Sequence, residues 1–524
     1  MDWAKAPQKR EQLVIFPRRL DDAVGPDHVV RLLDEILGRI DWDCWEANYD
    51  LTRGQPPIHP RVIASVILYG LLTRIRSTRA LEESLRVRID FMWLVEGRSI
   101  DHTTISEFRR KNADGLKDLF VQIGLIAQQM GWLTLETLAF DGTRLRANNR
   151  RSGTRTPAQF HELKTELAAK FTELEEKIAL ADEREQEVFG DSSPSTLNME
   201  LADTQRRLAK VDAALAELER LEQADQAIPK RLPLTDPQSR VTPNKDGGFA
   251  PNYTPLATVD VASGLIVAAD VIQHTDEDKH LISAIEDVQE NFHLDAPPPE
   301  MLADGMMATG DNLAACEERK ITLYAPLPND AADNPALRDD PSVPVAKEDR
   351  DRLPMIESKK GKPPQLDKQA FVYDEQNDCY WCPEGKRLPF LHTTSENRNG
   401  RRRIRSRYKA DPADCAACPL RSVCIKGNGR RREISRDQHA SHLARQRAQM
   451  KTKEAQDKYA QRRHAGERPF AVIKQQFGAR QFLTRGLERV KQEWLWLTTA
   501  FNLMQLLGLI RSGVDPPRAC TKTA

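Results

Sequence analysis

Two aspartates each close an apolar segment of the chain. Asp141 follows the run Leu138 to Phe140 in TLETLAFDGTRLRA, and Asp304 ends a similar run in EMLADG. Both runs are typical of buried strands. A carboxylate at such a strand end is costly to desolvate unless a cation partners it. We therefore expect Asp141 and Asp304 to belong to one metal site, the alternative being a pair of ordinary strand-end turn residues.

A third carboxylate lies in the segment KYAQRRHAGERPFAVIK. Tyr459, Arg463 and Glu467 are spaced by four residues, and Lys474 lies seven beyond Glu467. On a single helix these four side chains share one stripe. An acid flanked by cations on its own face is ordinarily a surface ion pair, so the pattern alone does not define a catalytic group. Pro469 fits such a helix only if the helix begins close to it.

Five of the eight cysteines are crowded between positions 379 and 424. Cys379 and Cys382 form one CxxC pair, and Cys415, Cys418 and Cys424 form a second group. Two CxxC pairs in a reducing compartment favour a tetrahedral structural zinc site over disulfides. We assign Zn²⁺ to Cys382, Cys415, Cys418 and Cys424 and leave Cys379 as the spare, with free thiols as the alternative. The ion would fold a basic lobe with too few apolar residues for a core of its own.

The charge of the chain is balanced overall but not locally. The formal net charge of the 524 residues is +0. Residues 398–436 carry thirteen Lys or Arg against three acids, and residues 442–494 carry thirteen against five. Basic segments in a neutral chain indicate a nucleic-acid face, or else a solvated basic surface. The length excludes a single hydrophobic core and predicts several domains.

The sequence does not predict a membrane protein. The first residues are charged and lack the apolar stretch of a secretory signal. The apolar run Val62 to Leu72 is far too short to cross a bilayer. Together with the cysteine usage, this predicts a cytoplasmic protein without a membrane partner.

Residues 1–130 predict several short helices. In IDHTTISEFRRKN, Thr104 and Glu107 have the spacing of a capping box, and the helix that follows carries Arg109 and Arg110. Short helices with a basic last one are typical of a helix-turn-helix DNA-binding domain. The alternative is a plain helical bundle.

The remaining segments alternate between strands and helices. We expect residues 131–157 and 231–330 to form a mixed α/β core, interrupted by a coiled-coil hairpin over 158–230 with a break at Gly190 to Ser195. A β-hairpin turns at Ala262 to Gly264. We expect residues 331–440 to contain a poorly ordered linker, up to about residue 370, followed by the cysteine-rich insertion. Residues 441–511 are predicted to form helices that complete the core, including an apolar helix suited to packing on a sheet. Residues 512–524 are predicted to be a tail. The order resembles a ribonuclease H-like core, in which carboxylates of the first and fourth strands lie side by side.

Over nearly its whole length, the chain resembles bacterial insertion-sequence transposases of the DDE type. The segments that carry the resemblance are HVVRLLDEIL, HPRVIASVILYG, STRALEESL, IDHTTISEFRR, FDGTRLRAN, LADG, CPEGK with CAACPLRSVC, and ERPFAVIK with RQFLTRGLERV and FNL. The resemblance implies that Asp141, Asp304 and Glu467 are the acidic triad. Tyr459, Arg463 and Lys474 match the family's tyrosine-arginine-glutamate-lysine signature.

Two positions depart from the family pattern. The tyrosine lies one residue further from the arginine than usual. Gly-Met-Met follows Asp304 where the family has a glycine-tyrosine pair, which puts any DNA contact of that tyrosine in doubt.

The family resemblance also implies a chemistry. Two Mg²⁺ ions, or Mn²⁺ in their place, would be bridged by Asp141 and held singly by Asp304 and Glu467, while Arg463 and Lys474 bind phosphates of the cleaved strand. The implied function is binding of the element's terminal inverted repeats, then cleavage and strand transfer into target double-stranded DNA. A homodimer is expected, because two element ends are handled together, and a nucleoid location in a bacterium. A catalytically inactive DNA-binding relic and a structure-directed nuclease are the alternatives.

Overall fold

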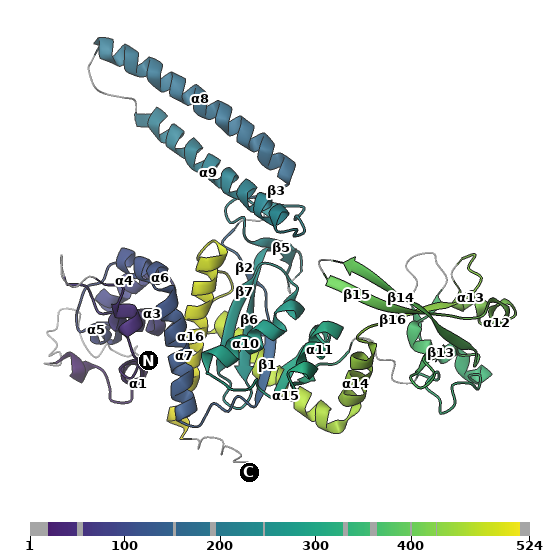
Figure 1. The fold of residues 1–524 in the computed structure, drawn as a ribbon. Helices are drawn as coiled ribbons and strands as arrows, with labels where there is room; N and C mark the ends of the chain where they lie inside the picture. Colours follow the sequence, from purple (N-terminus) through teal and green to yellow (C-terminus); the bar gives the residue numbers. More distant parts are fainter. Residues whose placement is uncertain are drawn as a thin grey trace, which may run out of the picture. The chain divides into compact units, whose positions relative to one another are not determined.

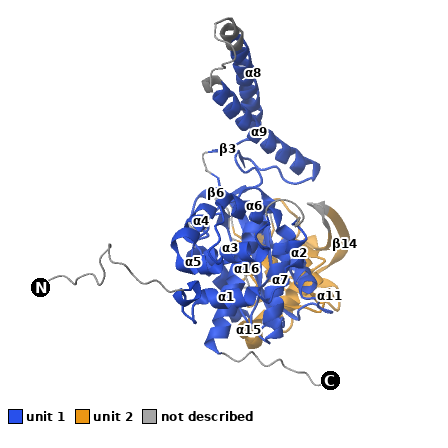
Figure 2. Ribbon diagram, turned by 90° about the vertical axis from the view of Figure 1, so that its left-hand side faces the viewer, with its two compact units in different colours: residues 1–302, 459–524 blue, residues 303–458 orange. Residues whose placement is uncertain are grey.

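The structure is a computed structural model. It describes residues 19–49, 56–149, 153–188, 195–244, 247–327, 334–356, 364–398, 401–425 and 427–513. The predicted break at 190–194, parts of the predicted linker and most of the predicted tail lie outside these residues. The chain forms two compact units, one of residues 1–302 with 459–524 and the other of residues 303–458 (Figure 2).

The first unit begins with short helices, as expected for the N-terminal region. They are η1 Leu20–Ala23, α1 Val29–Leu37, α2 Asp43–Glu46, α3 Pro60–Leu72, α4 Thr78–Val87, α5 Ile89–Leu94, α6 His102–Lys111 and α7 Ala113–Gln129. The capping box predicted at Thr104 is wrong. Asp101 caps α6 instead, because its Oδ1 accepts hydrogen bonds from the backbone N–H of Thr103 and Thr104 at 2.8 and 2.9 Å.

A mixed sheet forms the centre of the first unit (Figure 1). Its strands in this unit are β1 Thr137–Gly142, β2 Leu145–Arg146, β5 Arg240–Pro243, β6 Phe249–Asp260, β7 Ile266–Ile272 and β8 Glu300–Ala303. The long strand β6 pairs antiparallel with β1, β2, β5 and β7, and β8 lies on the other side of β1. Gly264, at a φ of 70°, closes the predicted β6–β7 hairpin. The α/β class with a helical N-terminal region is confirmed.

A long helical hairpin projects from the sheet between β2 and β5. Its helices are α8 Pro157–Val188 and α9 Ser195–Gln223, and two short strands, β3 Thr154–Arg155 and β4 Leu232–Pro233, pair at its base (Figure 1). Ion pairs of Lys164 with Asp212 (2.8 Å) and of Lys170 with Glu200 (2.7 Å) show that the two helices run antiparallel.

The C-terminal helix α16, Leu487–Ser512, packs between the sheet and the N-terminal helices of the first unit. On one side Trp494 Nε1 donates to the carbonyl of Leu256 in β6 at 3.0 Å, and Asn502 exchanges two hydrogen bonds with the backbone of Ile266 in β7. On the other side Trp496 packs against the ring of Trp45 from the N-terminal helices. The prediction that this apolar helix packs on a sheet is confirmed.

Helix α15 runs from Lys453 to Gln475 and passes straight through Pro469. The expectation that it begins close to Pro469 is therefore wrong. Proline removes only one helical hydrogen bond, and the buried neighbour Phe470 stacks on Trp494, with ring centroids 5.9 Å apart. That packing offsets the missing bond.

The second unit contains the cysteine-rich lobe. Its elements are η4 Gly305–Met307, α11 Gly310–Glu318, β9 Thr322–Tyr324, η5 Lys347–Arg352, β10 Met355–Ile356, β11 Gln365–Leu366, η6 Lys368–Ala370, β12 Val372–Asp374, β13 Cys379–Trp381, β14 Arg387–Arg398, β15 Arg401–Lys409, α12 Pro412–Ala416, α13 Arg421–Cys424, β16 Glu433–Asp437 and α14 Ala440–Lys451. Strands β12 to β16 form an antiparallel sheet in chain order.

The lobe has a hydrophobic core, contrary to expectation. Tyr380, Leu388 and Tyr408 from the sheet pack with Val345 and Leu353 from the segment predicted to be a linker. The prediction of a lobe too poor in apolar residues to form a core is therefore wrong, because aromatic residues and linker residues supply one. No helix among the described residues has the length and apolar character needed to cross a membrane.

Candidate active site

Asp141 lies at the carboxyl end of β1, where the strand turns away from the sheet. Its side chain is only 15% exposed, and its Oδ1 accepts a hydrogen bond from the backbone N–H of Gly142 at 3.0 Å. The guanidinium of Arg462, from α15, donates to the same oxygen at 3.2 Å and is 12% exposed. Because both groups are shielded from water, this ion pair is weakly screened. A cation thus already partners the strand-end carboxylate.

Helix α15 also approaches Asp141 at Gly466. A Cβ built on Gly466 lies 3.5 Å from the Cβ of Asp141. Glu467 is the next residue on this helix, and it is exposed. The structure therefore brings the helix segment that carries Glu467 to the end of the strand that carries Asp141.

Asp304 belongs to the second unit. It follows β8 directly, is exposed, and caps η4 by accepting a hydrogen bond from the backbone N–H of Met306 at 3.4 Å. Its meeting with Asp141 and Glu467 stays a prediction. Within the described part of the chain, no group of three or more His, Cys, Asp or Glu side chains is arranged to hold a metal ion.

The basic residues predicted around Glu467 differ in their surroundings. Lys474 Nζ lies 2.5 Å from the hydroxyl of Thr143, two residues beyond Asp141. Tyr459 is half-buried, while Arg463 is exposed to solvent. The arginine on Asp141 is therefore Arg462, which the sequence reasoning passed over. Arg462, Gly466 and Phe470 are spaced by four residues, so a search for the buried face of this helix would have found it.

A second acid near Asp141 was also missed. The carboxylate of Glu277, from the 3-10 helix η3 Glu277–His280, packs against Gly142, since a Cβ built there lies 2.6 Å from the Glu277 Cδ. Only glycine leaves space for this carboxylate. No spacing in the sequence points to Glu277, because it reaches β1 only through the pairing of β6 with β7.

The four cysteines assigned to zinc lie in the lobe of the second unit. Cys382 Sγ accepts a hydrogen bond from the backbone N–H of Lys386 at 3.3 Å, and Cys415 and Cys424 are part of the hydrophobic core. Burial, against the opposing charge of Arg432 and with a smaller contribution from the neighbouring thiols of Cys418, Cys382 and Cys415, raises the pKa of Cys424 to about 12. All four are free thiols. Four thiols are a suitable ligand set for Zn²⁺. Among the described residues, however, these side chains are not arranged as a group that could hold a metal ion.

Comparison with known proteins adds two family matches. Residues 381–507 match the model described as a transposase DDE domain, and residues 18–111 match a transposase domain known as DUF772. The first match contains the helix segment with Glu467, and the second contains the N-terminal helices up to α6. No curated protein matches the chain. Two transposase family matches, one towards each end, confirm the resemblance: the chain is consistent with a DDE-type insertion-sequence transposase.

Proposed function

We propose that the protein is a transposase that binds the terminal inverted repeats of its element and performs Mg²⁺-dependent DNA cleavage and strand transfer. The observation that carries this proposal is the convergence of Asp141 and the Gly466–Glu467 segment at one strand end. A buried carboxylate beside a second acid-bearing helix is the donor chemistry that a hard divalent cation requires. The DDE domain match over residues 381–507, which contains Glu467, supports this assignment.

Asp141, Asp304 and Glu467 would hold the ions in this proposal. Paired divalent cations would stabilise charge on the attacking and leaving oxygens of a phosphodiester. The ion pair with Arg462 supports the assignment, because it holds the carboxylate of Asp141 in place at the strand end. Lys474, anchored on Thr143, and the exposed Arg463 would bind phosphates of the cleaved strand.

The β14–β15 ribbon is a further DNA-binding element in this proposal. Its two strands pair over Phe390 to Arg398, and Arg403, Arg405 and Arg407 lie on β15. Phe390, Leu391 and Ile404 are exposed at 43, 49 and 38%. Strand β16 pairs with β15 over Arg405 to Lys409, so the ribbon is two-stranded only before Arg405. That part, which carries Arg403 and Ile404, fits the major groove of duplex DNA.

Zn²⁺ remains our proposal for the cysteine-rich lobe. Its ligands would be Cys382, Cys415, Cys418 and Cys424. Burial raises the pKa of Cys382, Cys418 and Cys424, so binding of the ion to these thiols would release protons. We expect purified protein to contain about one zinc per chain by elemental analysis, and chelation to raise protease cleavage within residues 379–430. Protection unchanged by chelation would contradict a structural ion.

The decisive experiment is a strand-transfer assay on labelled element-end DNA with Mg²⁺, beside Asp304→Ala. Joined products that disappear in the variant support the transposase. Nicks without joining support the nuclease, and binding without cleavage supports the relic. Mixing tagged and untagged chains on paired ends tests the expected homodimer.

A further inference from the structure

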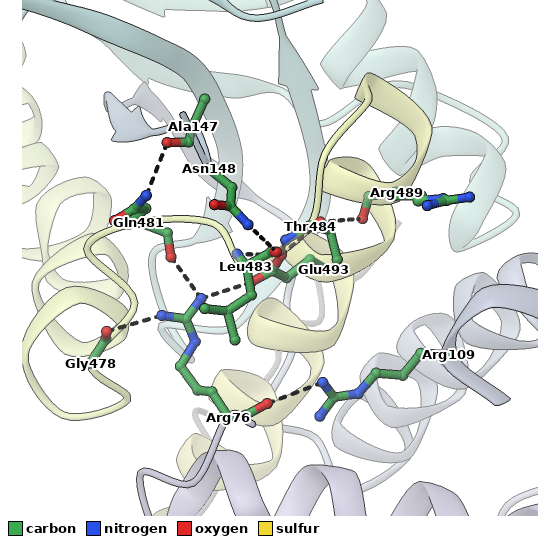
Figure 3. Close-up of polar contacts among 10 residues, drawn as sticks. All are labelled: Arg76, Arg109, Ala147, Asn148, Gly478, Gln481, Leu483, Thr484, Arg489 and Glu493. Carbon is green, nitrogen blue, oxygen red and sulfur yellow. Dashed lines mark hydrogen bonds and ion pairs between the residues drawn. The ribbon is translucent and has the colours of Figure 1, made fainter. Parts of the chain in front are cut away.

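A cavity of about 450 Å³ lies in the first unit, away from Asp141. It is bounded by the amino end of α4, by α6 and by α16 with the loop before it (Figure 3). Its charged lining consists of four arginines and one carboxylate, namely Arg76, Arg109, Arg110, Arg489 and Glu493. Leu71, Leu483, Trp496 and Leu497 form the apolar wall.

The carboxylate and one arginine neutralise each other. Arg76 Nη2 lies 2.7 Å from Glu493 Oε1, and the same guanidinium donates to the carbonyls of Gly478 and Gln481. Glu493 also accepts hydrogen bonds from the backbone N–H groups of Leu483 and Thr484 (Figure 3). Glu493 makes its direct contacts with Arg76 and the two backbone N–H groups, and it acts on Arg109 through its charge alone, so the lining sets four guanidinium groups against one carboxylate.

Arg109 has a buried donor atom without a hydrogen-bond partner among the described residues. Its Nη1 donates to the carbonyl of Arg76 at 3.2 Å (Figure 3), but its buried Nε has no hydrogen-bond partner among the described residues. Burial lowers the pKa of Arg109 to about 10, so the guanidinium stays charged at neutral pH. A buried cation with an unsatisfied donor is costly unless an anion completes its surroundings.

The amino end of α4 supplies neutral donors to the same cavity. Ser77 is the N-cap residue and makes no side-chain capping bond, although Ser77 and Thr78 both line the cavity. The first turn of this ten-residue helix contains no acid. Free N–H groups and the helix dipole at such an end favour a phosphate.

Two exposed arginines lie at the rim. Arg489, in the first turn of α16, is exposed and makes no ion pair within the described part of the chain, whereas the exposed Arg110 lies 3.5 Å from Glu107. Arg489 is therefore the rim cation most available to a ligand larger than the cavity itself, and the long pair of Arg110 with Glu107 is exposed to solvent, where it is weak.

We infer that this cavity binds a backbone phosphate of DNA, between the N-terminal helices and α16. The inference rests on the proposed function, and it adds a phosphate-anchoring point whose lining contains none of the three acids. DNA is favoured over a free anion because the exposed Arg110 and Arg489 extend the positive lining outside the cavity, where a polymer's neighbouring phosphates lie. Arg76 to Arg110 also fall within the transposase domain matched over residues 18–111.

The test measures duplex element-end DNA binding over a range of salt concentrations for Arg489→Gln and Arg109→Gln. Arg86→Gln is the matched control, because Arg86 lies on the far end of α4, is 61% exposed and pairs with Glu82. We expect each cavity variant to weaken binding roughly tenfold and to reduce the salt slope by about 1, with the control unchanged. Arg489→Gln decides the matter if Arg109→Gln does not fold.

Thermal unfolding separates DNA from a free anion. We expect inorganic phosphate, at ionic strength matched with chloride, and duplex DNA both to stabilise the full chain, and both effects to shrink in Arg489→Gln. Stabilisation by phosphate with DNA affinity unchanged in both variants would overturn DNA as the ligand. Equal losses in Arg86→Gln would overturn the site. These assays measure DNA binding and not DNA cleavage. A protein that binds DNA through the cavity but does not cleave it would therefore refute the proposed chemistry and leave the cavity proposal intact.

Discussion

Asp141 and Arg462 form the most informative contact of the candidate active site. The carboxylate of Asp141 is 15% exposed and lies 3.2 Å from the guanidinium of Arg462, which holds it in place at the end of β1. The sequence indicated Asp141 from its position after an apolar run, and the structure confirms the strand. The sequence did not indicate Arg462, because the predicted helix face was defined by the charged residues Arg463 and Glu467. The residues of α15 that contact β1 lie instead on the buried face of this helix.

Removing the charge of Asp141 should separate binding from chemistry. We expect Asp141→Asn to reduce cleavage of element-end DNA by at least about a thousandfold, because a neutral amide is a poor ligand for a hard cation. DNA affinity should stay within about twofold, as electrophoretic mobility shift would measure. Asp43→Asn, at the first residue of the short helix α2, is the control. Cleavage retained in Asp141→Asn would remove this residue from the catalytic set.

Gly142 makes space for Glu277. We expect Gly142→Ala to lower the free energy of unfolding by about 1–3 kcal/mol, because the new methyl group overlaps the Glu277 carboxylate. Urea denaturation measures this loss. Gly25→Ala is the control, since nothing lies within 4 Å of a Cβ at that position. An equal effect in both variants would mean that Glu277 moves away without cost.

At the scale of elements, the helical hairpin is tied to the sheet by a buried ion pair. Glu217 of α9, whose side chain is 5% exposed, lies 2.5 Å from Arg240 of β5 and 2.8 Å from Arg220. Burial raises the pKa of Glu217, but hydrogen bonds from the two arginines outweigh it and leave that pKa below its ordinary value. The pair therefore stabilises the protein above pH 4.5 and is lost as the pH falls through the lowered pKa.

Replacing this glutamate should destabilise the hairpin at neutral pH only. We expect Glu217→Gln to cost about 3 kcal/mol at pH 7, because a buried arginine loses its counter-charge, and progressively less as the pH falls through the lowered pKa of Glu217. Unfolding followed by circular dichroism over a series of pH values measures the difference. Glu219→Gln on the same helix is the control. A loss that does not depend on pH would contradict the ionic role of Glu217.

The order of elements was predictable, but their boundaries and packing were not. Periodicity and turn residues indicated the β6–β7 hairpin, the paired helices α8 and α9, and α16. The capping residue of α6 and the start of α15 were wrong, because local capping signals compete with neighbours such as Asp101 and with tertiary packing such as Phe470 on Trp494. The core of the cysteine-rich lobe was missed because linker residues such as Val345 and Leu353 contribute to it.

At the scale of the molecule, α16 joins the N-terminal helices to the sheet. The link between Arg76 and Glu493, each 13% exposed, is its principal charged contact with the N-terminal part. Sequence spacing gave no sign of this pair, because its members are far apart in the chain and meet only once the helices pack.

Breaking that pair should weaken the whole first unit. We expect Glu493→Gln to lower the free energy of unfolding by about 3–5 kcal/mol, because it leaves Arg76 buried without a counter-charge. Glu488→Gln, an exposed position in the first turn of the same helix, should change it by less than about 0.5 kcal/mol. Urea denaturation of both variants measures the contrast, and similar values would mean that solvent already screens the pair.

The last helix of the chain fills the space between elements made first, and this affects folding during synthesis. The sheet around β6 and the pocket for Trp496 against Trp45 keep apolar surface uncovered until the ribosome has released α16. A chain that ends before Leu487 would leave that apolar surface exposed to water, so we expect it to aggregate or be degraded more readily than the full chain.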